Sequence, residues 1–223
     1  MPETIITVRG QHSAWFDAER ATVTISVAFD GPDRDVVFAS ATTAADAVRE
    51  TITGLHDPSS GPITWWAADS VRVWSQRPWN DQGAQLDPVH YAALDLTARF
   101  TDFTALSQWI EKAVQIAGVS VGDIQWSLTD GRVTAVNAEV RSRAVKDAVA
   151  KATIYAQSIG LGTVSATAIA DPGMLGDSAA PQPGFEPRMA MKVGDSMGGA
   201  SPLALKPQQI EVSTAVDARF VAS

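Results

Sequence analysis

The sequence predicts an α+β protein in which a mixed, mostly antiparallel sheet packs with about three helices, one of them long and rich in alanine. Two patterns indicate this class. Apolar and polar residues alternate in several segments, as on strands with one buried face, and apolar residues recur every three or four positions in others, as on amphipathic helices. The chain has 223 residues, of which 45% are hydrophobic, enough to bury a core. We expect residues 1–223 to form a single domain.

Eight segments are expected to be strands, because each alternates apolar and polar residues or is a short apolar run between turn-forming residues. In chain order they cover residues 4–9, 14–16, 21–29, 63–75, 91–100, 119–128, 163–170 and 208–223. A glycine-containing turn at 10–13 is expected to separate the first two. A long loop at 76–88, with Pro78 and Gly83, is expected to join the fourth and fifth as a hairpin.

Three helices are expected, over residues 33–53, 104–117 and 133–159. The segment Asp30-Gly31-Pro32-Asp33 is expected to supply the cap of the first, and either Asp102 or Thr104 that of the second. Gly54 and Gly118 are placed to end these two helices. The third helix carries an inward stripe that we expect to consist of Val136, Val140, Ala144, Ala148, Ala152, Tyr155 and Ile159.

Residues 171–207 differ from the rest, because they are rich in Pro, Gly, Ala, Ser and Met and show no periodicity. We expect a long irregular loop here, either mobile or ordered only by packing on a partner. A thioether site for cuprous copper is the weaker interpretation, since no Cys or His accompanies the methionines. The methionines in this loop are Met174, Met189, Met191 and Met197. The strand at 208–223 then closes the sheet.

Composition excludes several classes of function. The net charge of −8 disfavours binding to nucleic acid, whose phosphates an acidic chain repels. The absence of cysteine excludes disulfides, thiolate metal sites and cysteine nucleophiles. No window approaches the ~18 continuous apolar residues of a membrane span. The sequence enters its first strand without a basic and apolar leader, which predicts a cytoplasmic location.

The order of these segments resembles the SIMPL-domain family, bacterial proteins largely of unknown function. The resemblance covers nearly the whole chain and implies an α+β fold, self-association and a stress-related role. It implies no catalytic residues, because the family supplies no agreed set. Two departures are the missing Pro-Asp pair before the strand at 21–29 and Gln208, where a glycine is common. The motifs are Val8-Arg9-Gly10, Ser127-Leu128-Thr129-Asp130, the alanine-rich helix around Ala144-Val145-Lys146-Asp147-Ala148, Gly160-Leu161-Gly162, and Lys206-Pro207-Gln208-Gln209-Ile210-Glu211-Val212.

A search for reactive groups predicts no catalytic, cofactor-binding or metal-binding residue. His12, His56 and His90 have no helical metal spacing, and solvated or locally hydrogen-bonded side chains are the favoured interpretation. The Gly160-Leu161-Gly162 segment follows a helix and precedes a strand, which is typical of a helix end and is the reverse of a dinucleotide loop. The acidic cluster before the first helix suits capping better than calcium binding.

Tryptophan is the most unusual feature, with seven residues, four of them in the hairpin region. Trp65 and Trp66 are adjacent on a strand and must point to opposite faces. Trp74 and Trp79 follow in the same region, close to His90. Two roles of these tryptophan side chains are weighed evenly, contact with another protein in an interface and packing in the core. An aromatic platform that binds a ligand is a less favoured third role.

These observations predict a non-enzymatic structural or interaction protein that associates with itself. The tryptophan region and residues 171–207 are expected to make the contacts between subunits. The alternative is a small-molecule-binding protein or enzyme, with a pocket between helix and sheet rimmed by Trp74, Trp79 and His90. A membrane-surface protein is a weaker third possibility, which the acidic charge disfavours.

Overall fold

The computed structural model describes residues 3–175 and 205–223, and confirms the α+β class. These described residues form three helices and eight strands, and all pairs of neighbouring strands among them are antiparallel. The strands form two sheets, where the sequence analysis expected one. Their orders are β1-β8-β7 and β3-β5-β2-β6, with β4 also paired to β5.

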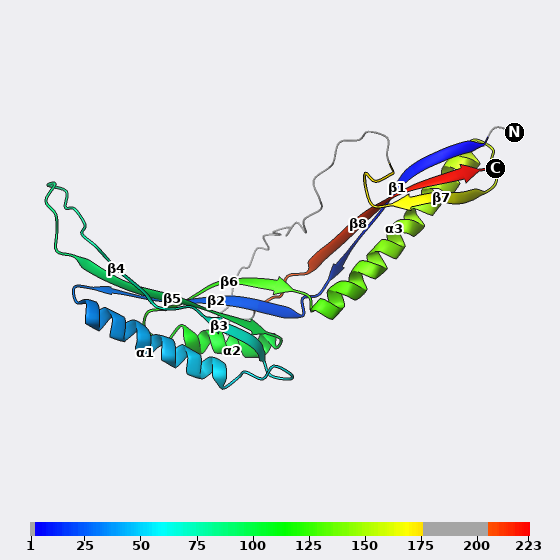
Figure 1. Cartoon of the computed structure of the whole chain (residues 1–223). Helices are drawn as coiled ribbons and strands as arrows, with labels where there is room; N and C mark the ends of the chain where they lie inside the picture. Colours follow the sequence, from blue (N-terminus) through cyan, green and yellow to red (C-terminus); the bar gives the residue numbers. More distant parts are fainter. Residues whose placement is uncertain (1–2, 176–204) are drawn as a thin grey trace, which may run out of the picture. The chain divides into compact units, whose positions relative to one another are not determined.

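The chain divides into two compact units, each with its own sheet. The first unit holds residues 3–17, 128–175 and 209–223 of the described chain, and the second holds 18–127 and 205–208. Alternating apolar residues face one side of each sheet, so each sheet needs a helical cover on that side only. Figure 1 shows helix α3 (Asp130–Ser158) beside the first sheet, and α1 (Arg34–Thr53) and α2 (Phe103–Ala113) beside the second.

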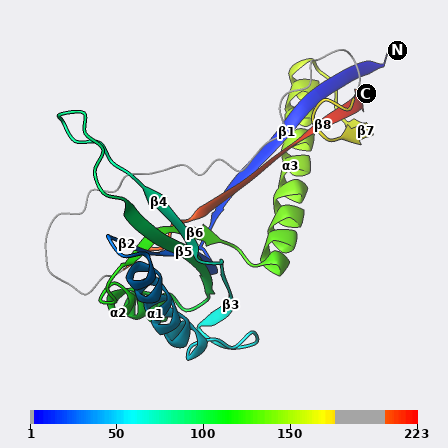
Figure 2. The same cartoon turned by 60° about the vertical axis from the view of Figure 1, so that its left-hand side comes forward.

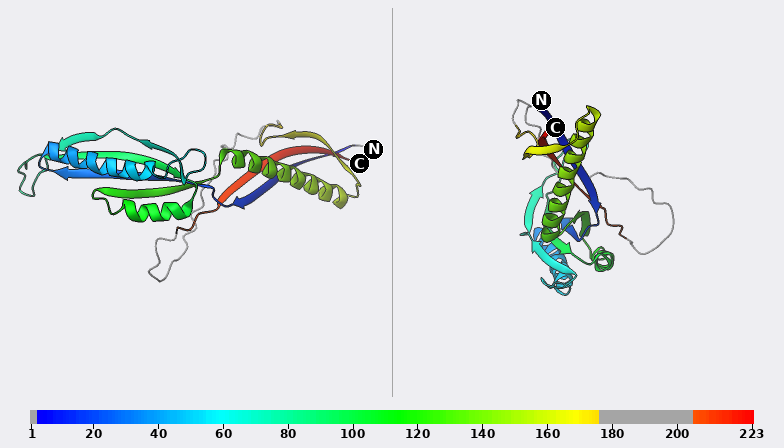
Figure 3. Two further views of the ribbon diagram at one scale, coloured as in Figure 1. Left: turned by 90° about the horizontal axis from the view of Figure 1, so that it is seen from below. Right: turned by 90° about the vertical axis from the view of Figure 1, so that its right-hand side faces the viewer.

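The first unit is built from the two ends of the chain and its third helix. Strands β1 and β8 pair along their whole length, from Thr4 with Ala222 to Phe16 with Ile210. Helix α3 packs mainly on these two strands (Figure 3). The elements are β1 (Thr4–Phe16), α3 (Asp130–Ser158), β7 (Val164–Ala170) and β8 (Ile210–Ala222).

The predicted turn at residues 10–13 is wrong, because β1 continues through it. Gly10 instead allows helix α3 to pack closely on β1. A Cβ at this position would lie 2.7 Å from both the backbone nitrogen and the Cβ of Ala148, and would also clash with the carbonyl oxygen of Ala144. The glycine therefore lets α3 approach β1 at a distance that no other residue permits.

The predicted stripe of α3 is confirmed from Val136 to Ala152 and continues with Ala156. Tyr155 and Ile159 were expected to point inward, but both are more than half exposed. Successive inward positions on this helix are four residues apart, whereas the predicted stripe stepped by three to reach Tyr155. The last turn therefore buries a small alanine against the sheet and leaves the two large side chains outside.

The second unit contains a five-stranded sheet whose apolar face is covered by two helices (Figure 1). Asp33 caps α1, and Asp102 caps α2, by accepting backbone N–H bonds from the first turn. Helix α2 is shorter than predicted. The elements are β2 (Arg20–Gly31), α1 (Arg34–Thr53), β3 (Ile63–Ala68), β4 (Arg72–Gln76), β5 (Val89–Phe100), α2 (Phe103–Ala113) and β6 (Val119–Ser127).

The predicted hairpin is confirmed, although its first arm is divided into β3 and β4. Both pair with β5, and the intervening Asp69 donates its backbone N–H to Asp95. The loop predicted at 171–207 lies mostly outside the described residues, which stop at 175 and resume at 205. The single-domain expectation for residues 1–223 stays a prediction.

Candidate functional site

Strand β3 places its two tryptophans on opposite faces, as the sequence predicts. Trp66 packs against the core beneath the helices, whereas the Trp65 side chain is 43% exposed on the open face of the sheet. The guanidinium carbon of Arg99 lies 5.2 Å from the centre of the Trp65 ring, in a cation–π contact. Arg99 was missed by sequence reasoning, because a bulge between Ile63 and Trp65 sets the register that brings them together.

Trp74, on β4, lies on the same open face, where β4 pairs with the first half of β5. Its ring stacks on Tyr91, the residue opposite it on β5, with ring centres 5.4 Å apart and planes 12° from parallel. The Trp74 side chain remains 41% exposed. His90 forms a 2.6 Å hydrogen bond between its Nδ1 and the hydroxyl of Ser75. Since neighbouring residues on a strand point to opposite faces, His90 and the Trp74–Tyr91 stack do not face one another.

The loop between β4 and β5 is an ordered turn that presents Trp79 to solvent. The side-chain oxygen of Asn80 accepts hydrogen bonds from the backbone nitrogens of Gln82 and Ala84, and Gly83 adopts the left-handed conformation (φ 75°) that the turn requires. Trp79 is 67% exposed, and Leu86 is exposed beside it. We call β4, β5 and residues 77–88 the tryptophan hairpin. It projects past the other strands of its sheet (Figure 2).

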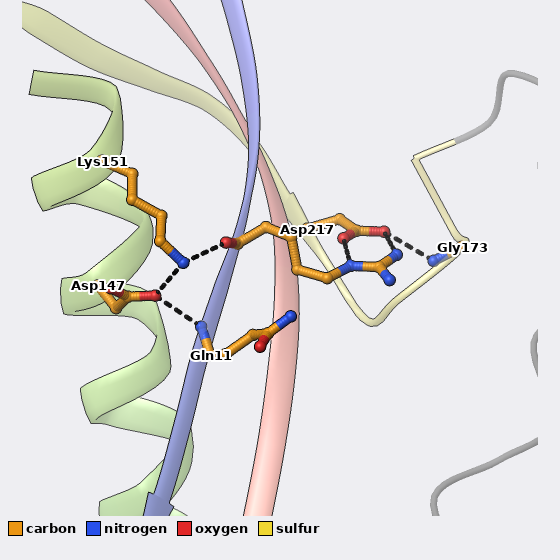
Figure 4. A network of polar contacts seen from close by, with 6 residues as sticks. Gln11, Asp147, Lys151, Gly173 and Asp217 are labelled. Carbon is orange, nitrogen blue, oxygen red and sulfur yellow. Dashed lines mark hydrogen bonds and ion pairs between the residues drawn. The ribbon is translucent and has the colours of Figure 1, made fainter. Parts of the chain in front are cut away.

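A polar network crosses the open face and edge of the other sheet (Figure 4). Arg9 forms two bonds with the Asp217 carboxylate, of 2.7 and 3.1 Å, and the backbone N–H of Gly173 donates to the same carboxylate. The hydrogen bond from Arg9 lowers the pKa of Asp217. A second ion pair joins Asp147 and Lys151 on α3. The carboxylates are engaged in structural bonds, so this network lacks the poised acid or base of a catalytic site.

A hollow of about 350 Å³ lies where β2 passes into α1. Asp33, which lines it, is already occupied in capping the helix. None of the predicted pocket residues Trp74, Trp79 and His90 lines this hollow. The lining residues are Phe29, Asp30, Gly31, Pro32, Asp33, Val36, Val37 and Ser40.

Within the described ranges, no three His, Asp or Glu side chains are grouped so that they could hold a metal ion. Three of the predicted methionine positions, Met189, Met191 and Met197, fall outside those ranges, and Met174 is exposed. None of the helices in residues 3–175 and 205–223 is both long and apolar enough to cross a membrane.

The fold and these surfaces define an α+β protein with two open sheet faces, one partly aromatic and the other carrying a polar network. The chain belongs to the SIMPL family, described as protein of unknown function (DUF541), whose model matches residues 6–220. The resemblance found in the sequence is thereby confirmed. No curated protein matches the chain.

Proposed function

We propose that this chain is a non-enzymatic protein that associates with further copies of itself through the tryptophan hairpin. The observation that carries the proposal is the exposure of two indoles of the hairpin, Trp74 and Trp79, with a third, Trp65 of β3, exposed on the same face of the sheet as Trp74. Exposed indoles in a cluster are typical of interfaces, where tryptophan contributes more binding energy than most residues.

The contrast with other tryptophans of the same unit supports this proposal. Trp109 is buried against Phe100, and Trp126 packs edge-on against Phe103. The unit therefore has a core that accepts indoles, yet the hairpin directs Trp79 away from it. The turn that holds Trp79 is fixed by its own hydrogen bonds, so a partner would bind it with little loss of conformational entropy.

Sedimentation velocity over a range of protein concentrations tests the proposal, with Trp79→Ser combined with Leu86→Ser as the variant. Both side chains are exposed at the turn, so the substitutions leave the core intact. We expect association to weaken by about thirtyfold, the value for losing one interface hot spot. Trp15→Ser is the matched control, since Trp15 is half-exposed on β1 and outside the hairpin. A wild-type chain that stays monomeric at about 500 µM, far above the dissociation constants of specific complexes, would overturn the proposal.

The alternative function, binding of a small molecule, has one observation in its favour. The open face carries the stacked rings of Trp74 and Tyr91. Further along the same face lie Arg99 of β5 and Trp65 of β3, which add a second aromatic and polar contact. Such surfaces bind flat or sugar-like ligands by stacking. Quenching of tryptophan fluorescence by a metabolite or oligosaccharide panel, lost in Trp74→Ala and kept in Trp79→Ser, would favour this function over self-association.

A further inference from the structure

The three-stranded sheet has two free edges, at β1 and at β7, and the two edges differ in how their backbone groups are protected. A free edge exposes backbone N–H and C=O groups that can pair with another chain. Proteins that remain monomeric protect such edges with charged side chains, bulges or short strands. The protection of each edge therefore indicates where the chain can accept a further strand.

The edge of β1 is protected by the ion pair of α3 (Figure 4). Asp147 accepts the backbone N–H of Gln11 at 2.8 Å, and Lys151 donates to the backbone oxygen of Arg9 at 3.0 Å. Asp147 and Lys151 are themselves 2.7 Å apart. The two side chains thus occupy two of the edge groups that an added strand would need, both in the middle of β1. We call this pair the β1 clamp.

The free edges of the five-stranded sheet are also protected. Strand β6 contains Asp123 and pairs with β2 through a bulge. Strand β3 has only six residues, and the backbone of Ile63 already bonds on its outer side to Leu55 and Asp57. Strand β4, with five residues, includes Arg72.

Strand β7 has none of these charges, and its bulge, between Ala166 and Ala168, follows the outward-facing positions Val164 and Ala166. Its seven residues are Val-Ser-Ala-Thr-Ala-Ile-Ala, and it pairs only with β8 among the described strands. Thr163 and Ser223 exchange both backbone hydrogen bonds, at 3.0 and 3.1 Å. Because the direction of backbone groups alternates along a strand, Val164 and Ala166 direct theirs to the free edge. The next described residues do not cover this edge, since Gly173 and Leu175 bond to side chains of β8.

Helix α3 presents its apolar flank on the side of β7. Two residues turn a helix by about 200°, so Val145 and Val149 lie on the flank opposite the β1 clamp. Val149 is 41% exposed, and Ile169 of β7 is 52% exposed although it points to the helical side of the sheet. A free edge and an apolar flank together form a surface suited to strand addition, in which backbone bonds give affinity and alternate side chains fill the flank.

We propose that the edge of β7 binds β7 of a second copy of this chain, antiparallel, so that two three-stranded sheets become one. The charge pattern identifies the partner. A twofold axis pairs residue i of one strand with residue j of the other and j with i, so a charge near the axis would meet a like charge. The chain carries a net charge of −8, yet β7 is uncharged and two copies can approach there without that cost. This contact goes beyond the tryptophan hairpin, which belongs to the other unit.

Ala166→Pro tests the proposal, because it removes an N–H that points to the free edge and not to β8. Each dimer would lose two such bonds and gain a steric block, so we expect association to weaken at least tenfold in sedimentation velocity. Ala166→Val is the matched control, as it keeps the N–H and suits a strand. Far-UV circular dichroism checks that both variants retain their fold. Hydrogen exchange of β7 should slow as the wild-type concentration rises.

The same experiment in the Trp79→Ser, Leu86→Ser background separates the two contacts. We expect a concentration-dependent dimer to persist in that background and to disappear when Ala166→Pro is added. A dimer unaffected by Ala166→Pro would overturn the β7 contact, whatever the hairpin variant shows. Exchange at β7 that is slow and independent of concentration would overturn it as well, and would indicate cover by another part of the same chain.

Discussion

Replacing Gly10 with alanine tests how closely α3 lies against β1. An added Cβ would lie 2.7 Å from both the nitrogen and the Cβ of Ala148, whereas ordinary contacts begin near 3.4 Å. It would also clash with the Ala144 carbonyl oxygen. The obstructing atoms belong mostly to the helix backbone, so the whole helix must move away from the strand.

The cost follows from two consequences of that movement. Overpacking by one methyl group costs about 1–3 kcal/mol in a close-packed interior. A shift of the helix would also stretch the bonds of the β1 clamp to Arg9 and Gln11, and each is worth about 0.5–1.5 kcal/mol. We therefore expect Gly10→Ala to lower the free energy of unfolding of this unit by about 4 kcal/mol.

Hydrogen exchange measured by mass spectrometry suits this prediction, because it follows peptides of β1 and α3 separately from the other unit. Six of the seven tryptophans lie in the other unit, so intrinsic fluorescence would report mainly on the wrong part of the chain. Gly131→Ala is the control, since a Cβ there meets nothing within 4 Å, and we expect a gain of about 0.5 kcal/mol from helix propensity. A Gly10→Ala protein within about 1 kcal/mol of wild type, which is the low end of the overpacking cost, would refute the reasoning.

Two further predictions concern single bonds. The pKa of Asp147 is lowered, chiefly by its bond with Lys151 and then by the Gln11 N–H. The contribution of Asp147 to stability is therefore fully present above the pKa of an unfolded carboxyl group, about 3.9. That contribution is lost as the pH falls through the lower pKa of the folded state. Asp147→Asn should therefore lower the free energy of unfolding at pH 7 by about 0.5–1 kcal/mol, as measured in urea titrations followed by circular dichroism. This difference from wild type should vanish in acid, and a constant difference down to pH 2 would contradict the reasoning. In the other unit, Trp109 donates from Nε1 to the Thr51 hydroxyl at 3.0 Å. Trp109→Phe should lower the free energy of unfolding by about 1–2 kcal/mol, measured by urea denaturation, and Trp109→Ala should lower it by about 3–5 kcal/mol. Equal costs for the two substitutions would contradict the importance of ring packing against Phe100.

The fold class could be predicted because local patterns decide it. The alternation in β2 and β5 depends on neighbours a few residues away and was predicted correctly. The caps are local as well: Asp33 belongs to the segment predicted to cap α1, and Asp102 is one of the two candidates for α2. The division into two sheets could not be predicted in this way, because it depends on which strands pair over long distances. Gly10 illustrates the difference: a glycine followed by polar residues is typical of a turn, but here it marks the place where a distant helix crosses the strand.

The surface features were predicted only in part. The opposite orientations of Trp65 and Trp66 follow from strand geometry alone and are confirmed. The contact between Trp65 and Arg99 depends on a bulge, and the β1 clamp depends on the height of α3 above the sheet; no pattern in the sequence reports either quantity. The signal that was available for the clamp is the pair of opposite charges four residues apart on the alanine-rich helix.

The pairing of β1 with β8 imposes an order on biosynthesis. A ribosome delivers β1 first and β8 last, and Arg9 meets its partner 208 positions later. Most of the unit with the five-stranded sheet lies between them in one continuous stretch, residues 18–127, and can fold as it emerges. Strand β1 has to wait, unpaired, until β8 has been made. A product that ends between residues 128 and 209 would have most of the five-stranded unit complete and the other unit without its central strand.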